Sequence, residues 1–108
     1  MWTVVYLPEA LQERERLPAR ERQPLYNATV KLQMIGPALG YPHTSAVQGV
    51  SQLRELRPRA GRSQWRALYR PAGQRFVIAA IAPEAQHDPT GFARACAAAT
   101  RRLSESEE

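Results

Sequence analysis

The fold of this chain is decided by one stretch, Leu53-Arg54-Glu55-Leu56-Arg57-Pro58-Arg59-Ala60-Gly61-Arg62-Ser63-Gln64-Trp65-Arg66-Ala67-Leu68-Tyr69-Arg70. On both sides of its central turn, arginines alternate with apolar residues. Successive side chains of a strand point to opposite faces of a sheet, so this pattern predicts one cationic surface and one core surface. Because arginine stays charged and binds phosphate through two parallel hydrogen bonds, the cationic surface indicates a polyanionic partner.

Three antiparallel strands are expected around this stretch. They are placed at about 50–57, 64–70 and 74–82, joined by turns at 59–62 and 71–73. Turns this short join antiparallel neighbours, because a parallel connection needs a crossover of about a dozen residues or more. The third strand contains the continuous apolar run Phe76–Ala82, which is typical of a strand covered on both faces.

The N-terminal half predicts a strand followed by two helices. Residues 2–6 are rich in β-branched and aromatic side chains, and Pro8 can begin a short helix that runs to Arg16. Residues 25–35 carry apolar side chains at the spacing of one helical face, and the pair Gly36-Pro37 ends this second helix.

Other segments predict breaks and ends. Pro24 either kinks the second helix or marks its beginning, because proline has no N–H to donate. Residues 38–49 are loop by composition. A last helix, capped by Thr90, is expected to run through Leu103, and the acidic tail 104–108 is expected to be frayed.

This order of elements predicts an α+β domain. We expect two N-terminal helices packed on a mainly antiparallel four-stranded sheet, with a C-terminal helix. A chain of 108 residues fits one domain, which we place at 1–103, with the tail 104–108 after it.

Positive charge is concentrated in the second half of the chain. Residues 54–103 carry ten arginines and three acidic residues, a balance of +7, within a chain of net charge +5. This asymmetry indicates an anionic partner such as nucleic acid. The alternative is a basic face that is only solvated.

The sequence holds few residues for disulfide or metal chemistry. Cys96 is the single cysteine, so an internal disulfide is impossible, and it is expected to be a small buried side chain. Two distant histidines and one cysteine do not form a zinc site. The N-terminus lacks the pattern of a signal peptide, and no apolar run is long enough to span a bilayer. We therefore expect a soluble cytoplasmic protein without membrane contact, metal or small-molecule cofactor.

Two short motifs carry a resemblance to a known family. Glu55-Leu56-Arg57 lies on one predicted strand, and Trp65-Arg66-Ala67-Leu68-Tyr69 lies on the next. With these motifs, the apolar fourth strand and the closing helix, the chain resembles the RelE/ParE superfamily of toxin–antitoxin toxins, most of all its phage-derived HigB-type branch. The resemblance covers essentially the whole chain. It implies a RelE-like fold, ribosome-dependent mRNA cleavage, and neutralisation by a cognate helix-turn-helix antitoxin.

The resemblance assigns roles to particular residues. Arg66 matches the arginine that contacts the scissile region in nuclease members, and Arg57 matches the arginine of the preceding strand. After the fourth strand the HigB-type branch usually has a Lys-Lys pair and then a polar run ending in proline. This chain has Pro83-Glu84 in place of the lysines, while Gln86 and Pro89 fit the pattern.

Metal-independent RNA cleavage needs a base, an acid and cations that stabilise the extra negative charge. Arg57 and Arg66 are the candidate cations, and His87 is the candidate for proton transfer in place of the lysines. Residues that position the RNA backbone would be Arg54, Arg59, Arg62, Arg70 and Gln86. Alternatively, the arginines only solubilise the sheet or bind an acidic antitoxin segment, and His87 is a solvated loop residue.

The strand alternation also predicts which side chains face outward. Trp65 and Tyr69 lie four residues apart and share a face, so they are expected in the core if Arg66 and Arg70 point to solvent. We then expect Arg57 and Arg66 to lie exposed and close together in one cationic concavity. His43 could reach the same face, but nothing in the sequence fixes it there.

Three functional hypotheses follow from the residues and the resemblance. The first is a toxin that cleaves mRNA on the ribosome as a metal-independent endoribonuclease. The second is a RelE-fold binding module without nuclease activity, which binds antitoxin and DNA or the ribosome. The third is a ParE-like inhibitor of gyrase, which shares the fold and needs no nuclease residues.

Overall fold

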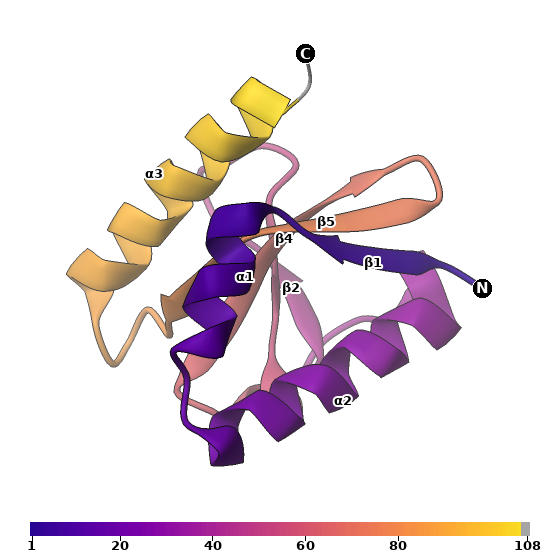
Figure 1. The fold of residues 1–108 in the computed structure, drawn as a ribbon, viewed down its shortest axis with the longest axis horizontal. Helices are drawn as coiled ribbons and strands as arrows, with labels where there is room; N and C mark the ends of the chain where they lie inside the picture. Colours follow the sequence, from indigo (N-terminus) through magenta and orange to yellow (C-terminus); the bar gives the residue numbers. More distant parts are fainter. Residues whose placement is uncertain (107–108) are drawn as a thin grey trace.

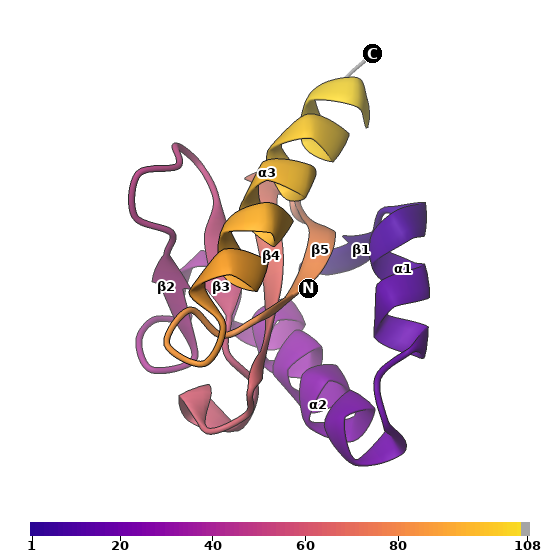
Figure 2. The same cartoon turned by 90° about the vertical axis from the view of Figure 1, so that its left-hand side faces the viewer.

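The computed structural model describes residues 1–106 and shows a five-stranded sheet with helices on both faces (Figure 1, Figure 2). The strands are β1 (Thr3–Tyr6), β2 (Thr44–Ala46), β3 (Arg54–Leu56), β4 (Trp65–Ala72) and β5 (Arg75–Pro83). The helices are α1 (Pro8–Glu15), α2 (Ala19–Ile35) and α3 (Pro89–Ser106). Two short 3₁₀ helices are η1 (Gly36–Ala38) and η2 (Pro58–Gly61).

The strand order across the sheet is β1-β5-β4-β3-β2. β1 runs parallel to β5, and every other neighbouring pair is antiparallel. Ala72 pairs with Arg75, so β4 and β5 are joined by a two-residue turn in which Gly73 has a φ of 64°. Glycine adopts this left-handed conformation without steric cost. The predicted α+β class with a mainly antiparallel sheet is confirmed.

The predicted count of four strands is wrong, because β2 forms within residues 38–49, which were expected to be loop. Its three residues are too few to show an alternating pattern among glycines and prolines. The predicted strand 50–57 is also too long, since only Arg54–Leu56 is strand. The chain from Val47 to Leu53 forms the β2–β3 connection instead, closed by a Val47 N–H to Leu53 carbonyl hydrogen bond of 2.9 Å.

Both faces of the sheet are buried, as the apolar run in β5 predicts. One core lies between the sheet and the two N-terminal helices, and it includes Leu25, Leu32, Leu56, Tyr69, Phe76 and Ile78. The other lies between the sheet and α3, and it includes Leu68, Ala79, Ala80, Cys96, Ala99 and Leu103. Tyr69 and Trp65 pack on the first side, as predicted.

The ends of α2 are set by backbone constraints. The helix begins at Ala19 and includes Pro24, so Pro24 does not mark its beginning. It ends where Gly36 adopts a φ of 72°, and a side chain at this position would also collide with the indole of Trp2. Glycine is therefore required for two reasons, its backbone conformation and the close approach of Trp2, which precedes β1.

Asp88, rather than the predicted Thr90, caps α3. The Asp88 carboxylate accepts a hydrogen bond of 2.9 Å from the Gly91 N–H, and Pro89 occupies the first helical position, where no N–H is needed. The helix continues through Ser106, so fraying does not begin at residue 104 as expected. Residues 107–108 lie outside the described residues.

Cys96 on α3 is buried, as predicted, and burial raises the pKa of its thiol. The pKa of Tyr6 is also raised, by burial of the phenol, although the nearby Arg14 guanidinium acts in the opposite direction. No helix among residues 1–106 has the length and apolarity needed to cross a membrane.

Glu13 on α1 connects three elements of the fold. β1 ends at Tyr6, opposite Ile78, so the β5 backbone beyond that point is no longer paired with β1. One oxygen of the Glu13 carboxylate accepts a 3.0 Å hydrogen bond from the Ile81 N–H there. The other oxygen accepts a 3.0 Å hydrogen bond from the guanidinium of Arg102 on α3. This carboxylate therefore replaces the missing strand partner and fixes both helices to β5.

We predict that Glu13→Ala lowers the free energy of unfolding by about 1.5–3 kcal/mol, because it leaves a backbone N–H and a guanidinium without their charged acceptor. Glu15→Ala on the same helix removes only an exposed ion pair with Arg14 and is expected to cost less than about 1 kcal/mol. Urea denaturation followed by circular dichroism measures both. Equal losses for the two variants would contradict the role given to Glu13.

Candidate functional site

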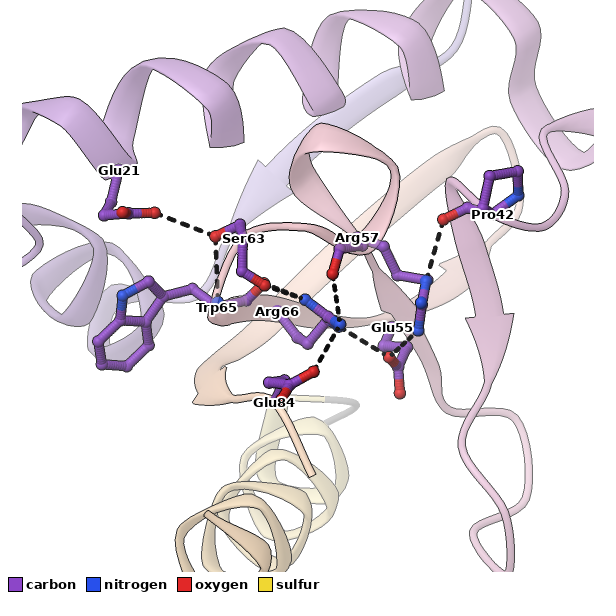
Figure 3. Close-up of polar contacts among 9 residues, drawn as sticks. Glu21, Pro42, Glu55, Arg57, Ser63, Trp65, Arg66 and Glu84 are labelled. Carbon is purple, nitrogen blue, oxygen red and sulfur yellow. Dashed lines mark hydrogen bonds and ion pairs between the residues drawn. The ribbon is translucent and has the colours of Figure 1, made fainter. Parts of the chain in front are cut away.

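Arg66 lies on β4 and uses every N–H of its guanidinium within the protein (Figure 3). Nε donates to the Glu55 carboxylate at 3.0 Å. Nη1 donates to the carbonyls of Ser63 at 2.7 Å and Trp65 at 3.0 Å. Nη2 donates to the Gly61 carbonyl and to the Glu84 carboxylate, both at 3.2 Å. A guanidinium has five N–H donors, so these five bonds leave none for a phosphate.

The prediction that Arg66 lies exposed is wrong, since only 3% of its side chain is accessible. Strand alternation correctly places it on the face opposite Trp65 and Tyr69, but α3 packs on that face. Burial of a charged group is tolerated when it is paired and hydrogen-bonded, and Arg66 meets both conditions. Its contacts hold Glu55, Glu84 and the turn before β4 in place.

Glu55 holds Arg66 and Arg57 together. One oxygen of its carboxylate accepts 3.0 Å hydrogen bonds from both guanidinium groups, so the predicted proximity of the two arginines is confirmed. Arg57 also donates from Nε to the Pro42 carbonyl at 2.9 Å and lies 5.2 Å from the ring centroid of Tyr41. Arg57 is half-buried, with 18% of its side chain accessible, and is not exposed as predicted. These contacts hold it in one orientation.

Glu84 supplies the second negative charge beside Arg57 and Arg66, after Glu55. It follows β5 at the position where the family resemblance led us to expect a lysine, and its backbone N–H donates to the Gln64 carbonyl at 2.8 Å. Its carboxylate reaches Arg66. Two arginines and two glutamates therefore give the cluster Glu55-Arg57-Arg66-Glu84 a net charge of zero. A lysine at position 84 would instead repel Arg66.

The turn that supplies carbonyls to Arg66 is attached to α2. Ser63 is buried, and its hydroxyl donates to the Glu21 carboxylate of α2 at 3.0 Å while accepting from the Trp65 N–H at 3.1 Å (Figure 3). The position of α2 relative to the Arg66 cluster is therefore set by direct hydrogen bonds.

The other predicted site residues differ in burial and in their place in the fold. Arg54 is half-buried and donates to the Thr44 hydroxyl at 2.8 Å. Arg70 is also half-buried, whereas the remaining predicted residues are exposed, namely Arg59, Arg62, Gln86 and His87. Gln86 and His87 lie in the loop between β5 and α3. Within residues 1–106, no hydrogen bond or ion pair joins His87 to Arg57 or Arg66. Of the three predicted catalytic residues, the structure links Arg57 and Arg66 through Glu55, and the role of His87 stays a prediction.

A groove of about 440 Å³ lies beside Arg57, between α2 and η2. We call it the α2–η2 groove. Its charged and polar lining residues are Arg20, Gln23, Asn27, Lys31, His43, Arg57 and Arg59. The α2 members of this set were not identified from the sequence. Their spacing of three or four residues, which places them on one helical face, was the available signal.

Within residues 1–106, His, Cys, Asp and Glu side chains do not gather in groups of three or more suited to a metal ion.

The sequence matches a known protein family over most of its length. A profile of the family described as phage-derived protein Gp49-like matches residues 12–82, more than half of the chain. The chain belongs to this Gp49-like family. No curated protein sequence matches it significantly.

Solved structures of RelE toxins share the fold of this Gp49-like protein. The isolated E. coli RelE toxin is 15% identical, with a TM-score of 0.62 over 77% of this chain and 84% of that chain. The RelBE2 toxin–antitoxin complex of Mycobacterium tuberculosis gives 17% identity and a TM-score of 0.60 over 77% of this chain and 98% of that chain. The Pyrococcus horikoshii RelE–RelB complex gives 16% identity and a TM-score of 0.54 over 76% of this chain and 93% of that chain. The predicted RelE-like fold is confirmed.

We predict that Arg66→Ala lowers the free energy of unfolding by about 3–5 kcal/mol, because Glu55 and Glu84 lose the cation that they share. Arg94→Ala removes an exposed arginine from α3 and is expected to change stability by less than about 0.5 kcal/mol. Guanidinium chloride denaturation curves measure the difference. An Arg66→Ala protein as stable as the Arg94→Ala protein would show that the buried cluster is not structural.

Proposed function

We propose that this Gp49-like chain is the toxin of a type II toxin–antitoxin pair and that it inhibits translation by cleaving mRNA on the ribosome. The observation that carries the toxin assignment is the RelE architecture in a chain that matches the Gp49-like profile over residues 12–82. Two of the similar structures are, by description, toxin–antitoxin complexes, and a third is a RelE–RelB complex. The proposed partners are therefore a cognate helix-turn-helix antitoxin and ribosome-bound mRNA, with action in the cytoplasm.

In the proposed reaction the RNA 2′-hydroxyl attacks the adjacent phosphorus, and the 5′ oxygen leaves. Arg57 is the best-placed cation to stabilise the transition state, because Glu55 and Pro42 fix its orientation. His43 lines the same groove as Arg57, and its carbonyl accepts a 2.8 Å hydrogen bond from the Arg57 N–H. His43 is therefore better placed for proton transfer than His87. Arg66 contributes by holding Glu55.

A second candidate function is arrest of translation by binding alone. The position of Glu84 specifically favours it, because this carboxylate occupies Arg66 where a lysine would supply a cation for catalysis. In this case the chain would block the ribosome without breaking the RNA strand. The two candidates differ in one measurable property, the integrity of the mRNA.

We predict that induced expression in a bacterial host stops growth and that incorporation of labelled methionine falls before incorporation of labelled thymidine. Inhibition of translation affects the first label directly, whereas inhibition of gyrase would affect the second label first. The control is the same gene with an early frameshift, which produces no protein. Co-expression of a neighbouring helix-turn-helix reading frame is expected to restore growth. Normal growth at high expression would reject the toxin assignment.

We predict that primer extension on mRNA from the arrested cells detects new 5′ ends inside open reading frames. Arg57→Gln is expected to reduce cleavage by about 10²–10³-fold, through loss of charge stabilisation. His43→Asn is expected to reduce it by about 10²–10⁴-fold, through loss of proton transfer. His87→Asn is the matched histidine control and is expected to cleave as the parent does. Arrest with intact mRNA would reject cleavage in favour of the binding function.

A further inference from the structure

The α2–η2 groove is cationic, in contrast to the neutral Arg66 cluster. Four permanent cations line it, of which Arg20, Lys31 and Arg59 are exposed and Arg57 is half-buried. Among the described residues that line the groove, none is an aspartate or glutamate. Within this lining, the positive charges of Arg20, Lys31 and Arg59 are therefore not neutralised by an ion pair. The floor is apolar and includes the buried residues Leu39 and Leu56.

The two walls of the groove are set by specific contacts and backbone conformations. One is α2, which is fixed to the β4 turn through the Glu21–Ser63 hydrogen bond. The other is η2, where Arg59 and Ala60 have φ values of 56° and 55° and Gly61 has a φ of 93°. A side chain on Gly61 would collide with the Arg57 guanidinium, so this glycine lets the turn close over Arg57. Such left-handed non-glycine residues concentrate at functional sites.

We propose that the α2–η2 groove binds the phosphate backbone of single-stranded RNA. Arginine and lysine side chains that no acidic residue of the lining neutralises suit phosphates, and the exposed amides of Gln23 and Asn27 suit ribose hydroxyls or base edges. Tyr41 is 77% exposed beside Arg57 and offers a ring on which a base can stack. The groove shares Arg57 with the Arg66 cluster, whereas Arg66 itself has no N–H left for RNA.

An acidic peptide helix fits the groove less well than RNA does. A helix that binds in a groove needs open apolar surface for its anchor residues. The apolar floor residues Leu39 and Leu56 are already buried within the protein, at 6% and 0% exposure. The lining also carries four permanent cations and the amides of Gln23 and Asn27, which favours a charged strand over an amphipathic helix.

This inference rests on the proposed function only for the choice of RNA as the ligand. The test uses the full chain and a fluorescein-labelled single-stranded RNA of mixed sequence and about 12 nucleotides. Fluorescence anisotropy gives the dissociation constant at several salt concentrations from about 50 to 200 mM. The groove variant is Arg20→Gln with Lys31→Gln. The matched control is Arg94→Gln with Arg101→Gln, which removes the same charge from exposed positions on α3.

The groove variant is expected to bind at least about tenfold more weakly than the parent at the lowest salt concentration. Its plot of log affinity against log salt is expected to be shallower by about 1.4, or about 0.7 for each phosphate that the protein no longer neutralises. The control variant is expected to retain affinity within about twofold, because its substitutions lie away from the bound phosphates.

Other outcomes overturn either the inference or the proposed function. Equal losses in the two double variants would show that only net charge matters. A larger loss in the α3 variant would place the RNA on the opposite face. If a polyglutamate peptide binds the groove and the RNA does not, the ligand is an acidic protein. RNA binding through the groove by a chain that is not toxic would keep the inference and reject the proposed function. Toxicity without groove-dependent RNA binding would reject the inference alone.

Discussion

The burial of one guanidinium organises this structure. Arg66 has 3% of its side chain accessible, and a buried cation without partners would cost several kcal/mol. The protein meets this constraint with five acceptors from three places: Glu55 on β3, the carbonyls of the turn that enters β4, and Glu84 after β5. The fold can bury this guanidinium only if all five acceptors lie within hydrogen-bonding distance of it. The cluster therefore fixes the register of the central strands and the path of the chain as it leaves β5.

This constraint separates structural charge from charge that is available to a ligand. The arginine-rich sequence between residues 54 and 70 suggests one continuous cationic surface, but part of that charge is neutralised inside the sheet. The available charge lies on the other side of Arg57, along α2 and the η2 turn. Arg57 belongs to both regions, since Glu55 orients it from the cluster while it lines the groove. In the proposed toxin, a substitution of Arg66 would disturb RNA binding through Glu55 and Arg57, without any contact between Arg66 and RNA.

The fold was predictable from the sequence to a greater extent than the site. The apolar run of β5, the proline and glycine signals at the ends of α1 and α2, and the short turns indicate the α+β architecture directly. The proximity of Arg57 and Arg66 also follows from their places on neighbouring strands. The burial of Arg66 does not, because its carboxylate partners lie 11 residues before it and 18 residues after it. Strand alternation identifies the face of a residue, but it does not show that α3 covers that face. The polar face of α2 was missed because only the apolar positions of that helix were used.

Anion binding in this protein is therefore expected to use Arg57 and the α2–η2 groove, while Arg66 is reserved for the fold. An NMR titration of the arginine Nε–Hε resonances with a single-stranded RNA distinguishes these two roles. We expect the Arg66 signal to exchange slowly with water and to keep its chemical shift, while the signals of Arg57, Arg59 and Arg20 move as RNA is added. A shift of the Arg66 signal as large as that of Arg57, with no change at Arg59 and Arg20, would show that the buried guanidinium binds the ligand and that the groove does not.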